Sequence, residues 1–233
     1  MGYKFYETAA EEGLLDFEKT VQYPFGYGLS YTSFTQEITS FSQSGDYVTV
    51  DVAVTNTGSV AGKDVVELYY TPPYTNGGIE KASVNLIDFG KTGLLEPGAS
   101  ETVSFRIPLE DMASYDSSCI KTAAGGYVLE AGEYAVSIRS DSHTVIDQRT
   151  FTLSADKDYS SSGRSTDQTA PVNRFDYMEG THPTLSRKDG FANYDAATAA
   201  PGEDEFELSK DRQNAIQEIS VVKYDPADYD NPD

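Results

Sequence analysis

A run of alternating valines between residues 47 and 56 limits the folds that this chain can adopt. In YVTVDVAVTN the apolar positions Val48, Val50, Val52 and Val54 are separated by residues that are mostly polar or small. Successive side chains of a β-strand point to opposite faces, so a period of two places all four valines on one face. The segment is therefore predicted to be a strand with one buried face, ended by an Asn-Thr-Gly turn.

Six further stretches have strand character: two alternate clearly, one is a β-branched and aromatic run (residues 63–70), and three have a weaker pattern dominated by β-forming residues. The seven predicted strands cover residues 34–41, 47–56, 63–70, 83–89, 103–107, 134–138 and 145–153. Short strands separated by turn signals at this spacing are typical of a two-sheet antiparallel sandwich. The sequence therefore predicts an all-β fold over residues 33–154, a seven-stranded antiparallel sandwich of the immunoglobulin or fibronectin III-like kind.

A tyrosine near the start of one predicted strand fits a known feature of such sandwiches. Leu129, Gly132 and Tyr134 have the spacing of a tyrosine corner, in which the tyrosine hydroxyl bonds back to the connection between the sheets. The alternative is an inward-facing tyrosine that simply follows a turn.

The character of the chain changes after residue 154. Residues 155–233 are rich in Asp, Ser, Thr, Ala and Pro, and the one helical pattern there covers residues 209–219. We expect a long, largely irregular C-terminal extension that lies against a partner surface, with the sandwich itself as one candidate.

Net charge excludes several classes of partner. The chain has 17 Lys and Arg against 38 Asp and Glu residues, which gives a formal net charge of −21 at pH 7. A negative field repels phosphate backbones and anionic lipids, so neither nucleic acid nor a membrane is an expected partner. The first residues lack the apolar core of a signal peptide. The compartment is left open, with a cytoplasmic or cell-associated location expected.

Residues for catalysis or metal binding are hard to single out. Cys119 is the only cysteine, and it is expected to act as a small apolar residue. His143 and His182 are far apart in the sequence, and each is expected to be an exposed loop residue without a partner. Spacings typical of a zinc site, a calcium loop or a phosphate-binding loop do not occur. No catalytic, metal-binding or cofactor-binding residue is therefore assigned.

One loop has the composition of a sugar-binding surface. Residues 69–78 (YYTPPYTNGG) combine tyrosines with proline and glycine, and Tyr70, Tyr74 and Asn76 are the candidate contacts. An aromatic ring can stack on the apolar face of a pyranose, while an amide can bond its hydroxyl groups. The alternative is a connection between sheets whose tyrosines are packed.

Longer motifs resemble those of a known family. The segments GYKFYET (residues 2–8) and YPFGYGLSYT (residues 23–32) are similar to the signature that joins two domains in family-three glycoside hydrolases, the β-glucosidase group. VTNTGSVAGKDVVELY (residues 54–69), LEPG (residues 95–98) and LEAGEY (residues 129–134) are similar to the fibronectin type III-like domain of that family.

The resemblance implies a domain organisation. Residues 1–32 would be the end of a preceding α/β domain with its connector, and residues 33–154 the fibronectin type III-like sandwich. In the commoner arrangement this domain ends the protein, whereas here a tail follows. Its segment LSRKDGFANY (residues 185–194) resembles the connector of circularly permuted members, in which the sandwich precedes a (β/α)8 barrel. Residues 155–233 are accordingly expected to be an extended acidic connector toward such a barrel.

The resemblance also implies a role. The nucleophilic aspartate of the family lies in the barrel and the acid/base residue usually in the α/β domain, so no catalytic residue and no cofactor are expected in this chain. Its expected role is to brace these two partner domains in an enzyme that hydrolyses terminal β-linked sugars. Tyr23, Phe25, Tyr27 and Tyr31 would form the inter-domain seam. Two alternatives stay open: a carbohydrate-binding module that uses residues 69–78, and an immunoglobulin-like adhesion module.

Overall fold

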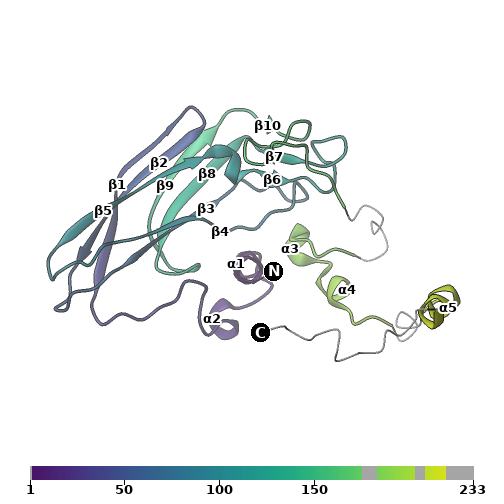
Figure 1. Cartoon of the computed structure of the whole chain (residues 1–233), viewed down its shortest axis with the longest axis horizontal. Coiled ribbons are helices and arrows are strands. Elements are labelled where there is room, and N and C mark those ends of the chain that lie inside the picture. Colours follow the sequence, from purple (N-terminus) through teal and green to yellow (C-terminus); the bar gives the residue numbers. More distant parts are fainter. Residues whose placement is uncertain (1, 175–182, 203–207, 219–233) are drawn as a thin grey trace, which may run out of the picture. The chain divides into compact units, whose positions relative to one another are not determined.

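The computed structural model describes residues 2–174, 183–202 and 208–218. By its internal contacts the chain separates into two compact units, residues 1–197 and residues 198–233. The first unit contains the β-sheets (Figure 1). The described part of the second contains α5 (Lys210–Glu218), which confirms the helix predicted near this position.

The alternating valines lie in the central strand of an antiparallel three-stranded sheet. Its order is β1 (Phe34–Ser44), β2 (Tyr47–Asn56) and β5 (Ser100–Pro108). All four valines of β2 are buried, and their neighbours along the strand face outward or are half-buried. The predicted strand is therefore confirmed, with the predicted face turned inward.

A four-stranded antiparallel sheet forms the second layer. Its order is β4 (Asn85–Lys91), β3 (Val65–Thr71), β8 (Gly132–Arg139) and β9 (Val145–Leu153). Each of the seven predicted strands overlaps a strand of one of these two sheets. The prediction of an all-β antiparallel fold is thus confirmed.

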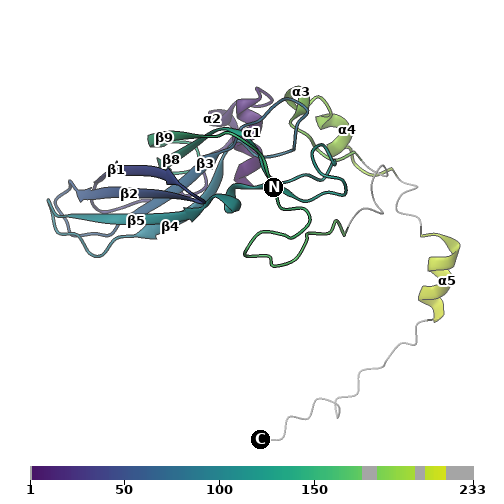
Figure 2. The same cartoon turned by 90° about the horizontal axis from the view of Figure 1, so that it is seen from above.

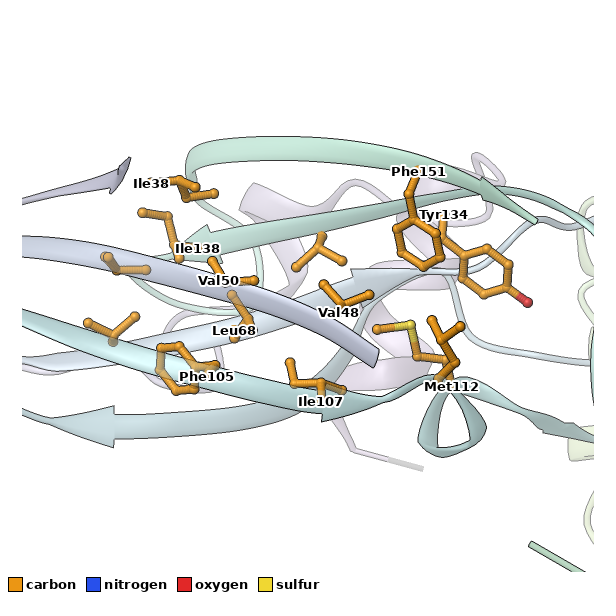
Figure 3. Close-up of a cluster of buried hydrophobic side chains, with 14 of the residues drawn as sticks. Ile38, Val48, Val50, Leu68, Phe105, Ile107, Met112, Tyr134, Ile138 and Phe151 are labelled. Carbon is orange, nitrogen blue, oxygen red and sulfur yellow. The ribbon is translucent and has the colours of Figure 1, made fainter. Parts of the chain in front are cut away.

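The inward faces of the two sheets share one hydrophobic core. Val50 of β2 and Phe105 of β5 lie in the same buried cluster as Leu68 of β3 and Ile138 of β8 (Figure 3). Full burial of an aliphatic or aromatic side chain of this size contributes roughly 1.5–3 kcal/mol relative to exposure. The two layers are therefore held together mainly by these interdigitating side chains.

A third, small sheet adds strands that the sequence does not predict. It consists of β6 (Ser114–Tyr115), β7 (Tyr127–Leu129) and β10 (Lys157–Asp158), next to the 3-10 helix η1 (Leu109–Met112). The described residues thus form ten strands rather than seven. Strands of two or three residues are too short to show a period, so no sequence pattern marks them.

A buried aspartate organises the turn after β6. The Asp116 carboxylate accepts hydrogen bonds from the backbone N–H groups of Ile120, Lys121 and Thr122 at 2.7–2.9 Å. Burial favours a higher pKa for Asp116, but these bonds outweigh it and hold the pKa below its ordinary value. Cys119 lies in this turn with a φ of 53° and is exposed. The expectation that Cys119 acts as a small apolar residue is therefore wrong, because it lies at the surface of a turn whose buried group is the Asp116 carboxylate.

The predicted tyrosine corner is present. Tyr134 is buried at the start of β8, and its hydroxyl donates a hydrogen bond to the backbone carbonyl oxygen of Glu130 at 2.9 Å. Its ring stacks on Phe151 of β9, with 5.3 Å between the ring centroids. The corner therefore ties the connection before β8 to the core.

Two short helices precede the sheets, α1 (Tyr3–Glu11) and α2 (Phe17–Thr20). Figures 1 and 2 show both helices beside the four-stranded sheet. The backbone N–H of Leu86 in β4 donates to the Tyr3 hydroxyl at 2.8 Å, so α1 is bonded directly to the sheet edge.

The contribution of the tyrosine corner to the stability of the sandwich can be tested. Replacing Tyr134 by Phe removes the hydroxyl and leaves the Glu130 carbonyl without this donor. The free energy of unfolding, measured by urea denaturation, should fall by about 1–2 kcal/mol. The matched control is Tyr31→Phe, since the side chain of Tyr31 is fully exposed. Equal losses in the two variants would contradict a corner that stabilises the fold.

Candidate functional site

The segment between α2 and β1 exposes an unusual amount of apolar surface. In this aromatic segment (residues 23–31), Leu29 is 90% and Tyr31 100% exposed, the highest values for large apolar side chains in the described residues. Its exposed large side chains are Tyr23, Phe25, Tyr27, Leu29 and Tyr31. Clustered apolar side chains on a surface mark contacts with other proteins or domains. All four predicted seam residues thus lie in one exposed segment.

The base of the aromatic segment is attached to the rest of the unit. The Phe25 ring stacks on Tyr3 of α1 with 4.5 Å between centroids, and the Phe25 carbonyl accepts the Ser142 N–H at 2.7 Å. Tyr23 and Tyr27 contact each other, with 5.1 Å between their ring centroids. The segment is therefore held at its base while its outer side chains stay exposed.

A glycine allows the aromatic segment to approach β3 closely. Gly26 has a φ of +90°, and a Cβ at this position would lie 2.3 Å from the Glu67 carboxylate. Only glycine fits this contact without displacement. The same Glu67 carboxylate accepts a hydrogen bond from the Tyr69 hydroxyl at 2.6 Å. Glu67 is therefore a packing point between the segment and the sheet.

Burial raises the pKa of both members of this pair. It raises the pKa of the Glu67 carboxyl, the Tyr69 hydrogen bond opposes that shift, and the Asp141 carboxylate adds to it. Burial and the Glu67 hydrogen bond also raise the pKa of the Tyr69 hydroxyl, which therefore keeps its proton at neutral pH. Tyr69 thus acts as a donor that holds the Glu67 carboxylate in place.

A groove of about 720 Å³ runs beside the aromatic segment. Gly28 and Leu29 of the segment form one side, and Gln36, Asp64 and Glu67 are among the other lining residues. Both acidic side chains are already engaged, since the Gln36 amide donates to Asp64 at 2.9 Å and Tyr69 to Glu67.

Helix α1 is joined to the β8–β9 turn by a buried polar network that sequence reasoning missed. The Glu7 carboxylate accepts the Ser142 hydroxyl at 2.6 Å and contacts His143 Nδ1 at 2.9 Å. The His143 ring stacks on Phe17 of α2, with 3.8 Å between centroids. The expectation that His143 lacks a partner is therefore wrong. Its partners lie more than 120 residues away in the sequence, where no local pattern could indicate them.

The candidate sugar contacts do not form one surface. Tyr70 packs against the hydrophobic core, and burial raises the pKa of its hydroxyl to about 12. Tyr74 lies under the Arg187 guanidinium, 3.9 Å from its ring centroid. The Asn76 amide donates to the Asp189 carboxylate at 2.6 Å and accepts the Asp189 N–H at 2.9 Å. The structure thus brings Tyr74 and Asn76 to the C-terminal tail and Tyr70 to the core.

The tail returns to the sheet through a docked segment (residues 184–194). Its Arg187 is 4% exposed and donates to the Glu12 carboxylate from Nε at 2.8 Å and from Nη2 at 2.6 Å. A third guanidinium bond reaches the carbonyl of Lys81 at 3.2 Å, and the Arg187 N–H donates to Glu80 at 2.7 Å. The docked segment therefore contacts both the end of α1 and the loop before β4.

The described residues hold no group of three or more His, Cys, Asp or Glu side chains that could bind a metal ion. Among the same residues, no helix is long and apolar enough to cross a membrane.

Comparison with known proteins identifies the region. Residues 64–142 match the fibronectin type III-like domain family. A β-glucosidase of Ruminococcus albus is 36% identical over 190 residues, which cover 81% of this chain and 19% of that protein. The solved β-glucosidase 3B of Thermotoga neapolitana is 35% identical with a TM-score of 0.57, over 67% of this chain and 20% of that one.

A solved family-three (GH3) β-glucosidase of Bifidobacterium adolescentis is 28% identical with a TM-score of 0.55, over 66% of this chain and 20% of that one. The chain therefore spans about a fifth of the length of the relatives that it matches. It contains a fibronectin type III-like domain and belongs, as a segment, to the family-three glycoside hydrolases.

Proposed function

We propose that this chain is the non-catalytic structural part of a β-glucosidase-type enzyme, and that it braces the catalytic domains of its parent protein. The parent would hydrolyse terminal β-linked sugars, as the names of the relatives indicate. A sandwich with a packed core leaves its outer faces and edges free for neighbouring domains. Its partners would be the α/β domain and the barrel.

The observation that carries this proposal is that the aromatic segment exposes large apolar side chains although its base is packed against α1 and β3. Leu29 and Tyr31 extend into solvent, while Phe25 and Gly26 are packed against α1 and β3. Large apolar side chains on a well-ordered support are typical of a surface that is buried in a larger assembly. Tyr23, Phe25, Tyr27 and Tyr31 are accordingly proposed as the inter-domain seam.

The proposed division of the chain follows from this role. Residues 1–32 end the preceding α/β domain and form a connector. Residues 33–154 are the sandwich, which we take as seven-stranded because its two main sheets have three and four strands. Residues 155–233 lead toward the barrel.

Support for the circularly permuted order comes from the length of one match. The match to the Ruminococcus albus enzyme covers 81% of 233 residues, about 189, whereas residues 1–154 number only 154. Part of the tail therefore has a counterpart in that relative. The sequence that follows residue 233 in the parent provides the test. A (β/α)8 barrel there would support this order, and a stop codon would exclude it.

The carbohydrate-binding alternative receives less support. It needs Tyr70, Tyr74 and Asn76 to be free for a ligand, but each of them is engaged with the core or with the docked segment. An adhesion module fits the fold but does not account for the likeness to β-glucosidases outside residues 64–142. Bracing is therefore the function that we propose.

Bracing can be tested in the full-length parent by the double variant Leu29→Ser and Tyr31→Ser. Burial of these two side chains against a neighbour would stabilise the interface by roughly 3–6 kcal/mol. The double variant should therefore unfold at a lower temperature in scanning calorimetry. In the isolated 233-residue chain, the same changes should leave the melting temperature nearly unchanged, because both side chains are exposed there.

The matched control in the parent is Ile120→Ser, a half-exposed apolar residue outside the aromatic segment. It should have little effect on the calorimetric transitions. A double variant that changed the KM of the parent enzyme for an aryl β-glucoside, at unchanged thermal stability, would contradict a bracing role.

A second test concerns catalysis by the chain itself. Because glycoside hydrolysis needs two carboxyl groups placed across the scissile bond, and none is assigned here, the purified chain should release no nitrophenol from an aryl β-glucoside above the buffer rate. Tyrosine fluorescence should also show no saturable change with glucose or cellobiose. Measurable turnover that persists through repeated purification would overturn the non-catalytic assignment.

A further inference from the structure

We propose that the docked segment (residues 184–194) is a latch. It holds the chain that leaves the sandwich, the outgoing connector, against α1 of the chain that enters it, the incoming connector. Arg187 makes the central contact of this latch. This inference rests on the proposed function, in which α1 belongs to the segment that enters the sandwich and the docked segment to the one that leaves it. The two are far apart in the sequence but lie side by side, as Figures 1 and 2 show for α1 and α3 (Lys188–Phe191).

The polar half of the latch is centred on one buried cation. Two nitrogens of the Arg187 guanidinium bond the same Glu12 oxygen, and the Glu11 carboxylate lies 3.6 Å away. The guanidinium also covers the Tyr74 ring, a cation–π arrangement. A buried arginine is costly unless it is paired, so the docked position of the segment depends on the acidic end of α1.

The apolar half of the latch begins four residues further along, at Phe191. Phe191 is buried and meets the Phe5 ring of α1 edge-on, with 5.9 Å between centroids. Tyr194 stacks on the same Phe5 ring at 6.3 Å. One residue of the incoming connector is therefore enclosed by two aromatic side chains of the outgoing one. Such aromatic pairs add a stabilising contact beyond simple burial.

The backbone of the docked segment needs these contacts. Asp189, Gly190 and Phe191 have φ values of 54°, 67° and 62°. For residues other than glycine this left-handed region is disfavoured, because the Cβ atom lies too close to the following carbonyl oxygen. Asp189 is held by Asn76 and Phe191 by Phe5. Because the docked contacts help to offset this strain, the loss of one contact should weaken the others.

In the parent enzyme the latch would affect the relative orientation of the two neighbouring domains. Because both connectors attach to the same place, the direction in which the chain enters the sandwich determines the direction in which it leaves. The latch would thereby couple the orientation of the two neighbouring domains without a direct contact between them.

Limited trypsin digestion of the 233-residue chain tests the latch, because trypsin cleaves after Arg187 and Lys188. In the wild type these bonds should be protected, and in Glu12→Gln they should be cleaved about tenfold faster, as followed by mass spectrometry. Phe191→Ala, which breaks the apolar half, should have a similar effect. Glu12→Asp keeps the charge and should retain most of the protection, which a purely steric role of Glu12 would not predict.

The matched control is Glu18→Gln, since Glu18 is an exposed acid of α2 outside the latch contacts. It should leave cleavage at Arg187 unchanged, while cleavage at Arg212 in α5 should be the same in every variant. The urea midpoint of the sandwich separates latch opening from global unfolding. Wild-type cleavage at Arg187 as fast as at Arg212, or equal rates in Glu12→Gln and Glu18→Gln, would overturn the latch. Neither result depends on the calorimetry that tests bracing.

Discussion

The interlocking of the inward faces of the two sheets is the constraint on which the rest of the molecule depends. A slip of one residue in β2 would replace Val50 by Thr49 or Asp51 in the core, because side chains alternate along a strand. The register with β1 and β5 is therefore set by the need to bury the valines against Leu68 and its neighbours. A base of this rigidity allows the aromatic segment to remain ordered while its outer side chains are exposed.

Buried charges attach the connectors to this base, and each of them is paired. Glu7 bonds Ser142 and His143, and Arg187 bonds Glu12. Buried pairs of this kind add little net stability, because desolvation offsets most of their attraction, but breaking one is costly. Their effect is therefore to select one docked arrangement. The chain has a net charge of −21, and in these contacts Glu7 and Glu12 have a structural role.

Local patterns predicted the sheets well and the attachments poorly. The strands of the two main sheets follow a period of two, and the corner at Tyr134 follows from its spacing to Gly132, so both could be found by inspection. The small third sheet could not, because its strands of two or three residues carry no period. The aromatic segment was identified by its likeness to a family motif, whereas its exposure is a property of the folded chain.

The sequence by itself determined which residues form the strands of the two main sheets, which face of β2 is buried, and to which family the chain is similar, because these depend on local periodicity and on contiguous motifs. Only the tertiary structure decided what surrounds Tyr74 and Asn76 and which group pairs with Arg187. Those contacts join residues more than 100 positions apart. Their geometry depends on how the sheets place α1 beside the loop before β4, and an isolated sequence pattern carries no information about that placement.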